Sequence, residues 1–208
     1  MTNSDADNDK TPYFDQNDYE IVQRDTLYSG VFRLMRYHVR QRLFKGGWSE
    51  IYTREILERF SAAAVLPYDP VLDRVILIEQ LRAGSLSNSK GPWLLEIPAG
   101  VLTGKETFIS TAHQEAWEEA GCTLQALYPI TEYYVSPGTS TEYLSVFCGK
   151  IDATGVGGIH GLAHEHEDIR VLDLAYHEAL EKLQRGEIKT SPAIIALMWL
   201  QLNREHFL

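Results

Sequence analysis

Short apolar runs alternate with segments of helical composition from residue 62 to the C-terminus. The runs at 62–68, 75–80 and 93–97 have the length and composition of strands. The segments 107–120 and 192–204 are predicted helices, because a glycine follows the first and a proline begins the second. Strands interleaved with a few helices favour an α/β fold in which helices cover both faces of a mixed sheet.

The rest of this region continues the pattern, with strands predicted at 127–135, 142–150 and 169–174 and a helix at 175–186. Gly155–Glu167 contains several glycines and histidines and is expected to form a long loop. Ser85–Gly91 is polar and is expected to form a shorter one. Residues 60–208 are therefore predicted to form one α/β domain.

The N-terminal part of the chain differs in composition. Strands rich in aromatic and β-branched residues are predicted at 19–28, 31–44 and 49–60, with a hairpin turn at Gly46-Gly47. We therefore expect a small antiparallel β domain over residues 18–59. Residues 1–17 are polar and acidic, and a disordered tail is expected there.

The bulk composition is that of a soluble globular protein, with 44% hydrophobic and 23% charged residues in 208. Apolar runs fall well short of the roughly 20 residues that span a bilayer, so no membrane partner is expected. The first ten residues are too polar and acidic for a signal peptide, and only Cys122 and Cys148 are cysteines. These features favour a cytoplasmic protein without a disulfide framework.

The formal net charge is −10. A field of this sign repels nucleic acid and argues against a nucleic-acid partner. It also repels phosphate groups. A phosphate-containing ligand would therefore require local arginines, a metal ion, or both.

The predicted helix at 107–120 carries three glutamates, Glu115, Glu118 and Glu119, spaced so that they share one face. Like charges at this spacing cost a few tenths of a kcal/mol per pair, roughly, unless a cation lies among them. Carboxylate oxygens suit Mg²⁺ or Mn²⁺, and the glycine-containing turn at Gly100 lets the Ala99 carbonyl approach such an ion. Taken alone, the glutamates are also compatible with a solvated acidic face.

A longer pattern surrounds these glutamates. Gly100, Glu106 and the run Gln114-Glu115-Ala116-Trp117-Glu118-Glu119-Ala120-Gly121-Cys122 are separated by five and seven residues. This arrangement resembles the signature of the Nudix hydrolase superfamily. Each fixed position of that signature matches except one, because Gln114 stands where the superfamily has arginine.

The resemblance covers the chain from about Tyr19 onward and points to the bacterial ADP-ribose pyrophosphatase group. The matching segments are Arg54-Glu55, Glu79-Gln80-Leu81-Arg82, Trp93-Leu94-Leu95-Glu96, Ser136-Pro137-Gly138 with Glu142, and Gly158–Ala163 followed by Glu165, Glu167 and Asp168. Pro137 is the customary marker of this group. The resemblance implies a Nudix α/β/α sandwich and a homodimer in which the N-terminal domain completes the partner's substrate pocket.

The resemblance also assigns roles to individual residues. It implies metal ligands at the Ala99 carbonyl, Glu115, Glu119 and Glu167, with Mg²⁺ as the ion and Mn²⁺ as a possible substitute. Glu118 belongs to the same catalytic cluster, and Glu165 matches the residue that activates the attacking water. Without the resemblance, Glu165 and Glu167 would be taken as residues of a solvated loop.

Substrate contacts are implied for Arg54, Glu55, Arg82, Tyr28 and Glu142. Arginine provides a planar donor fork for phosphate oxygens, although Arg54 and Glu55 are also compatible with a simple ion pair. Tyr28, with Phe32 nearby, could stack on a base or belong to a hydrophobic core.

Two alternatives concern the site itself. His160, His164 and His166 lie within one loop and offer a transition-metal site, although no cysteine lies near them in sequence. Gln114 carries no charge, so it holds its glutamate partner less firmly than arginine would. We therefore expect a slower or more metal-demanding enzyme.

Three functions are compatible with these residues. The first is Mg²⁺-dependent hydrolysis of ADP-ribose to AMP and ribose 5-phosphate. The second is hydrolysis of another nucleoside diphosphate sugar, such as GDP-mannose. The third is a non-catalytic nucleotide sensor, which the retention of Glu115, Glu119 and Glu167 makes less favoured.

Overall fold

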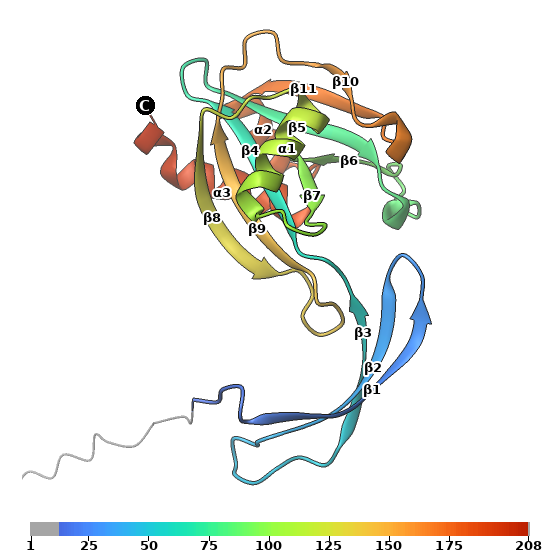
Figure 1. Cartoon of the computed structure of the whole chain (residues 1–208). Coiled ribbons are helices and arrows are strands. Elements are labelled where there is room, and N and C mark those ends of the chain that lie inside the picture. The colour runs from blue at the N-terminus through green and yellow to red at the C-terminus, as the bar shows by residue number, and fades with distance from the viewer. Residues whose placement is uncertain (1–12, 208) are drawn as a thin grey trace, which may run out of the picture. The chain divides into compact units, whose positions relative to one another are not determined.

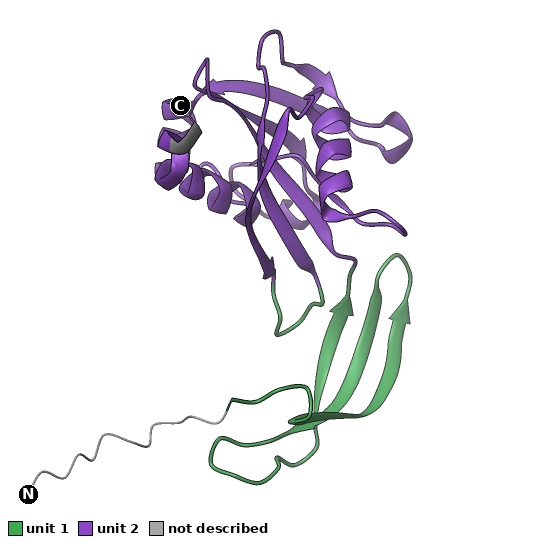
Figure 2. Ribbon diagram, turned by 60° about the vertical axis from the view of Figure 1, so that its left-hand side comes forward, with its two compact units in different colours: residues 1–59, 136–141 green, residues 60–135, 142–208 purple. Residues whose placement is uncertain are grey.

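The computed structural model describes residues 13–207, without the side chains of 206 and 207. The tail predicted over residues 1–17 therefore lies mostly outside the described residues. The chain divides into two compact units, shown in Figure 2. Unit 1 holds the chain up to Arg59 together with Ser136–Thr141, and unit 2 holds Phe60–Val135 together with the chain from Glu142 onward.

Unit 1 contains an antiparallel sheet of order β1-β2-β3. Its strands are β1 (Tyr19–Ser29), β2 (Arg33–Gln41) and β3 (Tyr52–Glu58). The segment Ser136–Thr141 is attached to β3 by two backbone hydrogen bonds, from Leu57 N to Thr139 O (2.8 Å) and from Thr141 N to Leu57 O (3.1 Å). The prediction of an antiparallel N-terminal sheet is confirmed.

Unit 2 is built on a mixed sheet of order β10-β11-β5-β4-β9-β8, with β6 added to β5 and β7 added to β4 (Figure 1). The strands are β4 (Ala62–Asp69), β5 (Arg74–Leu81), β6 (Trp93–Glu96), β7 (Ala99–Val101), β8 (Ala126–Tyr134), β9 (Tyr143–Lys150), β10 (Gly158–His160) and β11 (Ile169–Ala175). β4 and β9 are parallel, and the other pairs are antiparallel.

Helices cover both faces of this sheet. They are α1 (Phe108–Ala120), α2 (Tyr176–Gln184) and α3 (Ser191–Asn203). Because side chains alternate along a strand, Ala63 and Val65 of β4 pack in the cluster that contains α1. Leu66 and Tyr68 pack in the opposite cluster, with α2 and α3. The α/β/α sandwich predicted from the sequence is confirmed.

Two expectations about loops were wrong in part. Gly155–Glu167 contains β10 and the 3₁₀ turn η2 (Ala163–Glu165), because Gly158–His160 pairs with β11. The turn expected at Ala99 and Gly100 belongs to β7, which pairs with β4. Both strands are only three residues long and depend on distant partners, so local composition does not mark them.

The remaining short elements are the 3₁₀ turns η1 (Ala83–Ser85), which ends at the first residue of the predicted loop 85–91, and η3 (Arg204–Phe207). Cys122 and Cys148 are buried and form no disulfide. None of the helices in the described part of the chain has the length and apolar composition needed to cross a membrane.

Candidate active site

Both ends of α1 are fixed by local contacts. The Thr107 hydroxyl accepts a hydrogen bond from Ser110 N (3.1 Å), and the Ser110 hydroxyl accepts one from Thr107 N (2.8 Å). Gly121 ends the helix in the left-handed conformation, with φ of 65°. A Cβ atom at Gly121 would lie 2.6 Å from the His160 ring, so a larger residue would also have to displace this ring. These contacts set the rotation of the helix, and hence the direction of its glutamates.

Glu119 points into the protein and is only 3% exposed. Its Oε2 accepts a hydrogen bond from the backbone N–H of Ala99 (2.8 Å). Burial raises the pKa of Glu119 to about 8. The nearby charges of Glu115 and Glu167 raise this pKa further, whereas the Ala99 N–H and the Arg82 charge lower it.

Glu115 lies one turn earlier on the same face of α1, against Gly100. A Cβ atom at Gly100 would overlap the Glu115 carboxylate, so a larger residue there would displace this side chain from its present position. Burial raises the pKa of Glu115 to about 7, and the charges of Glu118, Glu167 and Glu165 add to the increase. The structure therefore brings together acidic residues from α1 and from the loop after β10.

The loop after β10 is attached to α1 through its backbone. Gly161 N donates to the Glu118 carbonyl (3.2 Å), and Leu162 N donates to Oε2 of Glu167 (3.0 Å). Gly161 has φ of 100°, and a Cβ there would lie 2.7 Å from the Cβ of Glu167. Glu165, in contrast, is exposed and has only His164 as an ion-pair partner among the described residues (3.6 Å).

The chemistry of this cluster fits a divalent cation. Its side-chain donors are carboxylate oxygens, and two of the carboxyl groups have pKa values raised toward neutral by burial and mutual repulsion. A hard cation would relieve both effects. Within the described residues, however, no three acidic, histidine or cysteine side chains are already gathered closely enough to hold an ion.

Arg82 lies on the same face of the sheet as this cluster. It follows β5, and its Nε donates to Oε2 of Glu96, which is buried at the end of β6 (2.8 Å). Gln80 also donates to that oxygen (3.3 Å). Neither Gln80 nor Glu96 was singled out as a functional residue from the sequence. Two signals were available, because both residues lie in segments that match the family and Glu96 is an acidic residue within the apolar run 93–97.

Glu142 is the second predicted substrate contact in unit 2, besides Arg82. It lies immediately before β9 in unit 2 and is half-buried. Gln114 Nε2 lies 3.2 and 3.3 Å from the two carboxylate oxygens of Glu118. The uncharged Gln114 amide therefore contacts a glutamate of the pattern through hydrogen bonds, without the positive charge that an arginine would supply.

Three predicted substrate residues lie in unit 1. Arg54 stacks on the Tyr52 ring (4.6 Å), while Glu55 forms an ion pair with Arg36 of the neighbouring strand (2.8 Å). Arg54 and Glu55 therefore do not form an ion pair with each other, and that alternative was wrong. Tyr28 is 63% exposed, so it is not a core aromatic.

Phe32 is also exposed and lies beneath the Arg59 guanidinium, 5.0 Å from it. An exposed aromatic ring under a cation has no role in a hydrophobic core. Phe32 and Tyr28 are therefore both surface residues, and the alternative that they belong to a hydrophobic core is excluded.

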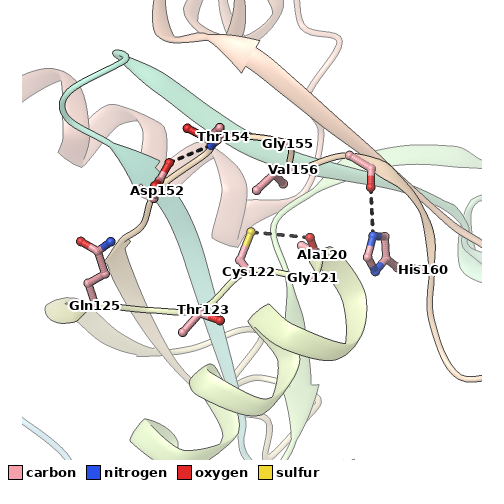
Figure 3. A pocket seen from close by; sticks show the side chains of 11 residues that line it. Ala120, Gly121, Cys122, Thr123, Gln125, Asp152, Thr154, Gly155, Val156 and His160 are labelled. Carbon is pink, nitrogen blue, oxygen red and sulfur yellow. Dashed lines mark hydrogen bonds between the residues drawn. The ribbon is translucent and has the colours of Figure 1, made fainter.

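The histidine alternative is not supported. The His160 side chain is directed to the Gly157 carbonyl (3.0 Å), as Figure 3 shows. His164 lies beside Glu165, and the described residues hold no cluster of metal-ligating side chains. Figure 3 also shows the pocket of about 310 Å³ that His160 lines at the C-terminal end of α1. None of the clustered glutamates lines this pocket.

Comparison with known proteins identifies the family of this chain. The NUDIX domain family model matches residues 58–194. The chain is 45% identical over 192 residues to the ADP-ribose pyrophosphatase of Escherichia coli K12, covering 92% of each protein. It is 41% identical over 194 residues to the ADP-ribose pyrophosphatase of Haemophilus influenzae, covering 92% of this chain and 89% of the relative.

A more distant relative is the GDP-mannose pyrophosphatase of Cronobacter sakazakii, 34% identical over 157 residues, with 73% of this chain and 79% of the relative covered. A solved structure described as an ADP compounds hydrolase has a TM-score of 0.68 at 16% identity, covering 91% of this chain and 95% of that one. The structural likeness supports the fold. The family match and the close relatives show that this chain belongs to the NUDIX domain family.

Proposed function

We propose that this protein hydrolyses the pyrophosphate bond of ADP-ribose and releases AMP and ribose 5-phosphate. The observation that carries the proposal is the pair of glutamates on one face of α1, half-buried Glu115 and buried Glu119, which lie against Gly100 and Ala99. This cluster occurs in a chain 45% identical to an ADP-ribose pyrophosphatase over 92% of both lengths. Burying a carboxylate lowers the free energy of unfolding, and carboxyl groups with strongly raised pKa values therefore occur preferentially at functional sites.

The proposed cofactor is Mg²⁺, with Mn²⁺ as a substitute. The Ala99 carbonyl and the carboxylates of Glu115, Glu119 and Glu167 are the proposed ligands, because the acidic cluster offers hard oxygen donors. When bound, the ion supplies charge stabilisation for the pyrophosphate and lowers the pKa of a bound water.

The proposed proton acceptor is Glu165. Its carboxylate is exposed at the loop that also carries Glu167, so it is accessible to a water beside a bound substrate. Glu118 completes the acidic cluster and is held by Gln114. Arg82 and Arg54 are proposed to bind phosphate oxygens through their planar donor forks. The further proposed substrate contacts are Glu55, Tyr28 and Glu142.

We also propose a cytoplasmic homodimer. Met35 is the one buried hydrophobic side chain among the described residues of unit 1, and aromatic residues of its strands are exposed. A small sheet with so little core generally needs another surface to cover it. Size-exclusion chromatography with light scattering should give twice the chain mass of 23.6 kDa, and a monomer mass would contradict the dimer.

A phosphatase-coupled phosphate-release screen tests the activity. Purified protein with Mg²⁺ is offered a panel of nucleoside diphosphate sugars, alongside the variants Glu115→Gln and Glu119→Gln. Glu181→Gln serves as the control, because Glu181 is an exposed glutamate on α2. We expect turnover of ADP-ribose that the two cluster variants lose and the control keeps. Binding without turnover of any panel member would instead favour the nucleotide-sensor alternative.

GDP-mannose is the second candidate substrate, because a GDP-mannose pyrophosphatase is 34% identical to this chain. The identity is lower and the coverage smaller than for the ADP-ribose pyrophosphatases. We therefore expect the higher kcat/KM with ADP-ribose. A higher kcat/KM with GDP-mannose would reverse the order of the two candidates while retaining the reaction.

A further inference from the structure

Glu96 is a buried carboxylate to which the proposed reaction gives no role. It ends β6 opposite Ile78 of β5, and Ile78 packs in the cluster that contains α1. Glu96 therefore points to the sheet face on which the glutamate cluster lies. A carboxylate buried to this extent is costly unless it is paired and hydrogen-bonded.

The partners of Glu96 all meet at one oxygen. Nε of Arg82 donates to Oε2, and Nη2 of Arg82 lies 2.8 Å from the same atom. Gln80 Nε2 donates to it from 3.3 Å. Gln80 lies in β5, and Arg82 follows two residues later with an extended backbone, so the two side chains point to the same face. Glu96 is thus fixed by both residues on the side of the sheet that faces α1.

This arrangement leaves one edge of the Arg82 guanidinium available. Nη1 has no hydrogen-bond partner within residues 13–207 of the structure. The guanidinium is planar and rigid, so holding Nε and Nη2 also sets the direction of Nη1. Arg82 is close enough to the cluster for its charge to act on Glu119, and its side chain is half-exposed.

We propose that Glu96, held by Gln80, positions the Arg82 guanidinium to bind a phosphate of the substrate's pyrophosphate. The inference rests on the proposed function, because it assigns Arg82 a phosphate ligand at that site. Without Glu96, the long arginine side chain must be ordered at the moment of binding, which weakens affinity. The phosphate is bound before and during the reaction, so the loss should appear mainly in KM and little in kcat.

Glu96→Gln tests this, with Glu79→Gln as the matched control. Glu79 also pairs with an arginine across neighbouring strands, Arg170, but it points to the opposite face of the sheet. We expect Glu96→Gln to raise KM for ADP-ribose about tenfold and to change kcat less than about threefold. Glu79→Gln should change neither. Equal effects of the two variants, or an unchanged KM in Glu96→Gln, would overturn the inference.

A double-mutant cycle with Arg82→Ala separates positioning from a direct or structural role. If Glu96 acts through Arg82, Glu96→Gln should have no further effect on KM once Arg82 is replaced. Equal fold-changes in the presence and absence of Arg82 would contradict the proposal. If Glu96→Gln is not recovered folded, Gln80→Leu removes one donor to Glu96 and should raise KM about threefold, again only when Arg82 is present.

Calorimetric titration with inorganic pyrophosphate distinguishes failure of this inference from failure of the proposed function. Pyrophosphate carries neither base nor sugar, so its binding does not depend on the substrate being ADP-ribose. No turnover of ADP-ribose, with Glu96 and Arg82 still coupled in pyrophosphate binding, would refute the proposed function and retain the inference. Turnover of ADP-ribose by the native chain, without coupling between Glu96 and Arg82 in pyrophosphate binding, would refute the inference and retain the proposed function.

Discussion

The two faces of the sheet in unit 2 bury different chemistry. The face covered by α2 and α3 buries apolar side chains together with Tyr68, whose hydroxyl reaches Asp73. The face covered by α1 buries Glu119, Glu96 and Gln80 beside its apolar residues. Burying carboxylates opposes folding, whereas burying alkyl groups favours it. One face therefore mainly stabilises the fold, and the other retains costly charges where the proposed chemistry takes place.

The largest effect is expected when one carboxylate is removed from the α1 face. Glu119→Gln is expected to lower kcat/KM for ADP-ribose by at least about a hundredfold, because it removes a proposed metal ligand. The same change should leave the metal-free protein at least as stable as before at neutral pH, because glutamine can be buried without taking up a proton or carrying a charge. Steady-state kinetics and urea unfolding measure the two effects. Retained activity would show that Glu119 is not needed.

A substitution on the face covered by α2 and α3 should instead change stability and not activity. Leu197 of α3 is fully buried, and Leu197→Ala should lower the free energy of unfolding by about 3 kcal/mol. The folded enzyme should keep its kcat, since Leu197 lies in the cluster on the opposite face from the glutamates. Urea unfolding and assays on the folded protein check both parts. A kcat reduced as strongly as in Glu119→Gln would remove the functional distinction between the faces.

The stability of the metal-free protein should depend on pH through Glu119, which lies on the α1 face. The pKa of Glu119 rises from 4.5 to about 8 on folding, so the folded state binds more protons than the unfolded state between these values. The stabilising contribution is complete below about pH 4.5 and is lost as the pH rises toward 8. Thermal unfolding in EDTA should therefore show Tm falling over this range, and less so in Glu119→Gln. An identical pH profile for both proteins would contradict the assignment.

Gln114 provides the smallest expected effect. It contacts Glu118 with an uncharged amide donor, and an arginine would add a positive charge to the same contact. Gln114→Arg should lower the Mg²⁺ concentration for half-maximal activity, with an increase in rate of about threefold at limiting Mg²⁺. Magnesium titrations of both proteins measure this. Equal rates at every Mg²⁺ concentration would show that glutamine is an adequate substitute.

The sequence was most informative where local rules determine structure. The helix with Glu115, Glu118 and Glu119 was predicted from its composition and its terminal glycine, and the spacing of the glutamates places them on one face. The Thr107 cap at its start was found only in the structure. The predicted alternation of strands and helices likewise gave the sandwich. The roles assigned to Ala99, Glu165 and Glu167 came from family resemblance, and they remain predictions.

Features that depend on distant pairing were not predictable. β10 exists because Gly158–His160 meets β11, and glycine has little strand propensity of its own. Glu96 resembles an ordinary solvated acid at the end of a strand until Arg82 and Gln80 are brought beside it. The partner of Glu55 was open for the same reason, since Arg36 lies opposite it in the neighbouring strand.

The most direct test of the account is turnover of ADP-ribose by the native chain with Mg²⁺, with EDTA, and with Mg²⁺ restored. Products are identified by chromatography as AMP and ribose 5-phosphate. We expect formation of both products with Mg²⁺, loss of activity in EDTA and recovery when Mg²⁺ is returned. No hydrolysis of ADP-ribose with Mg²⁺, or an undiminished rate in EDTA, would contradict it.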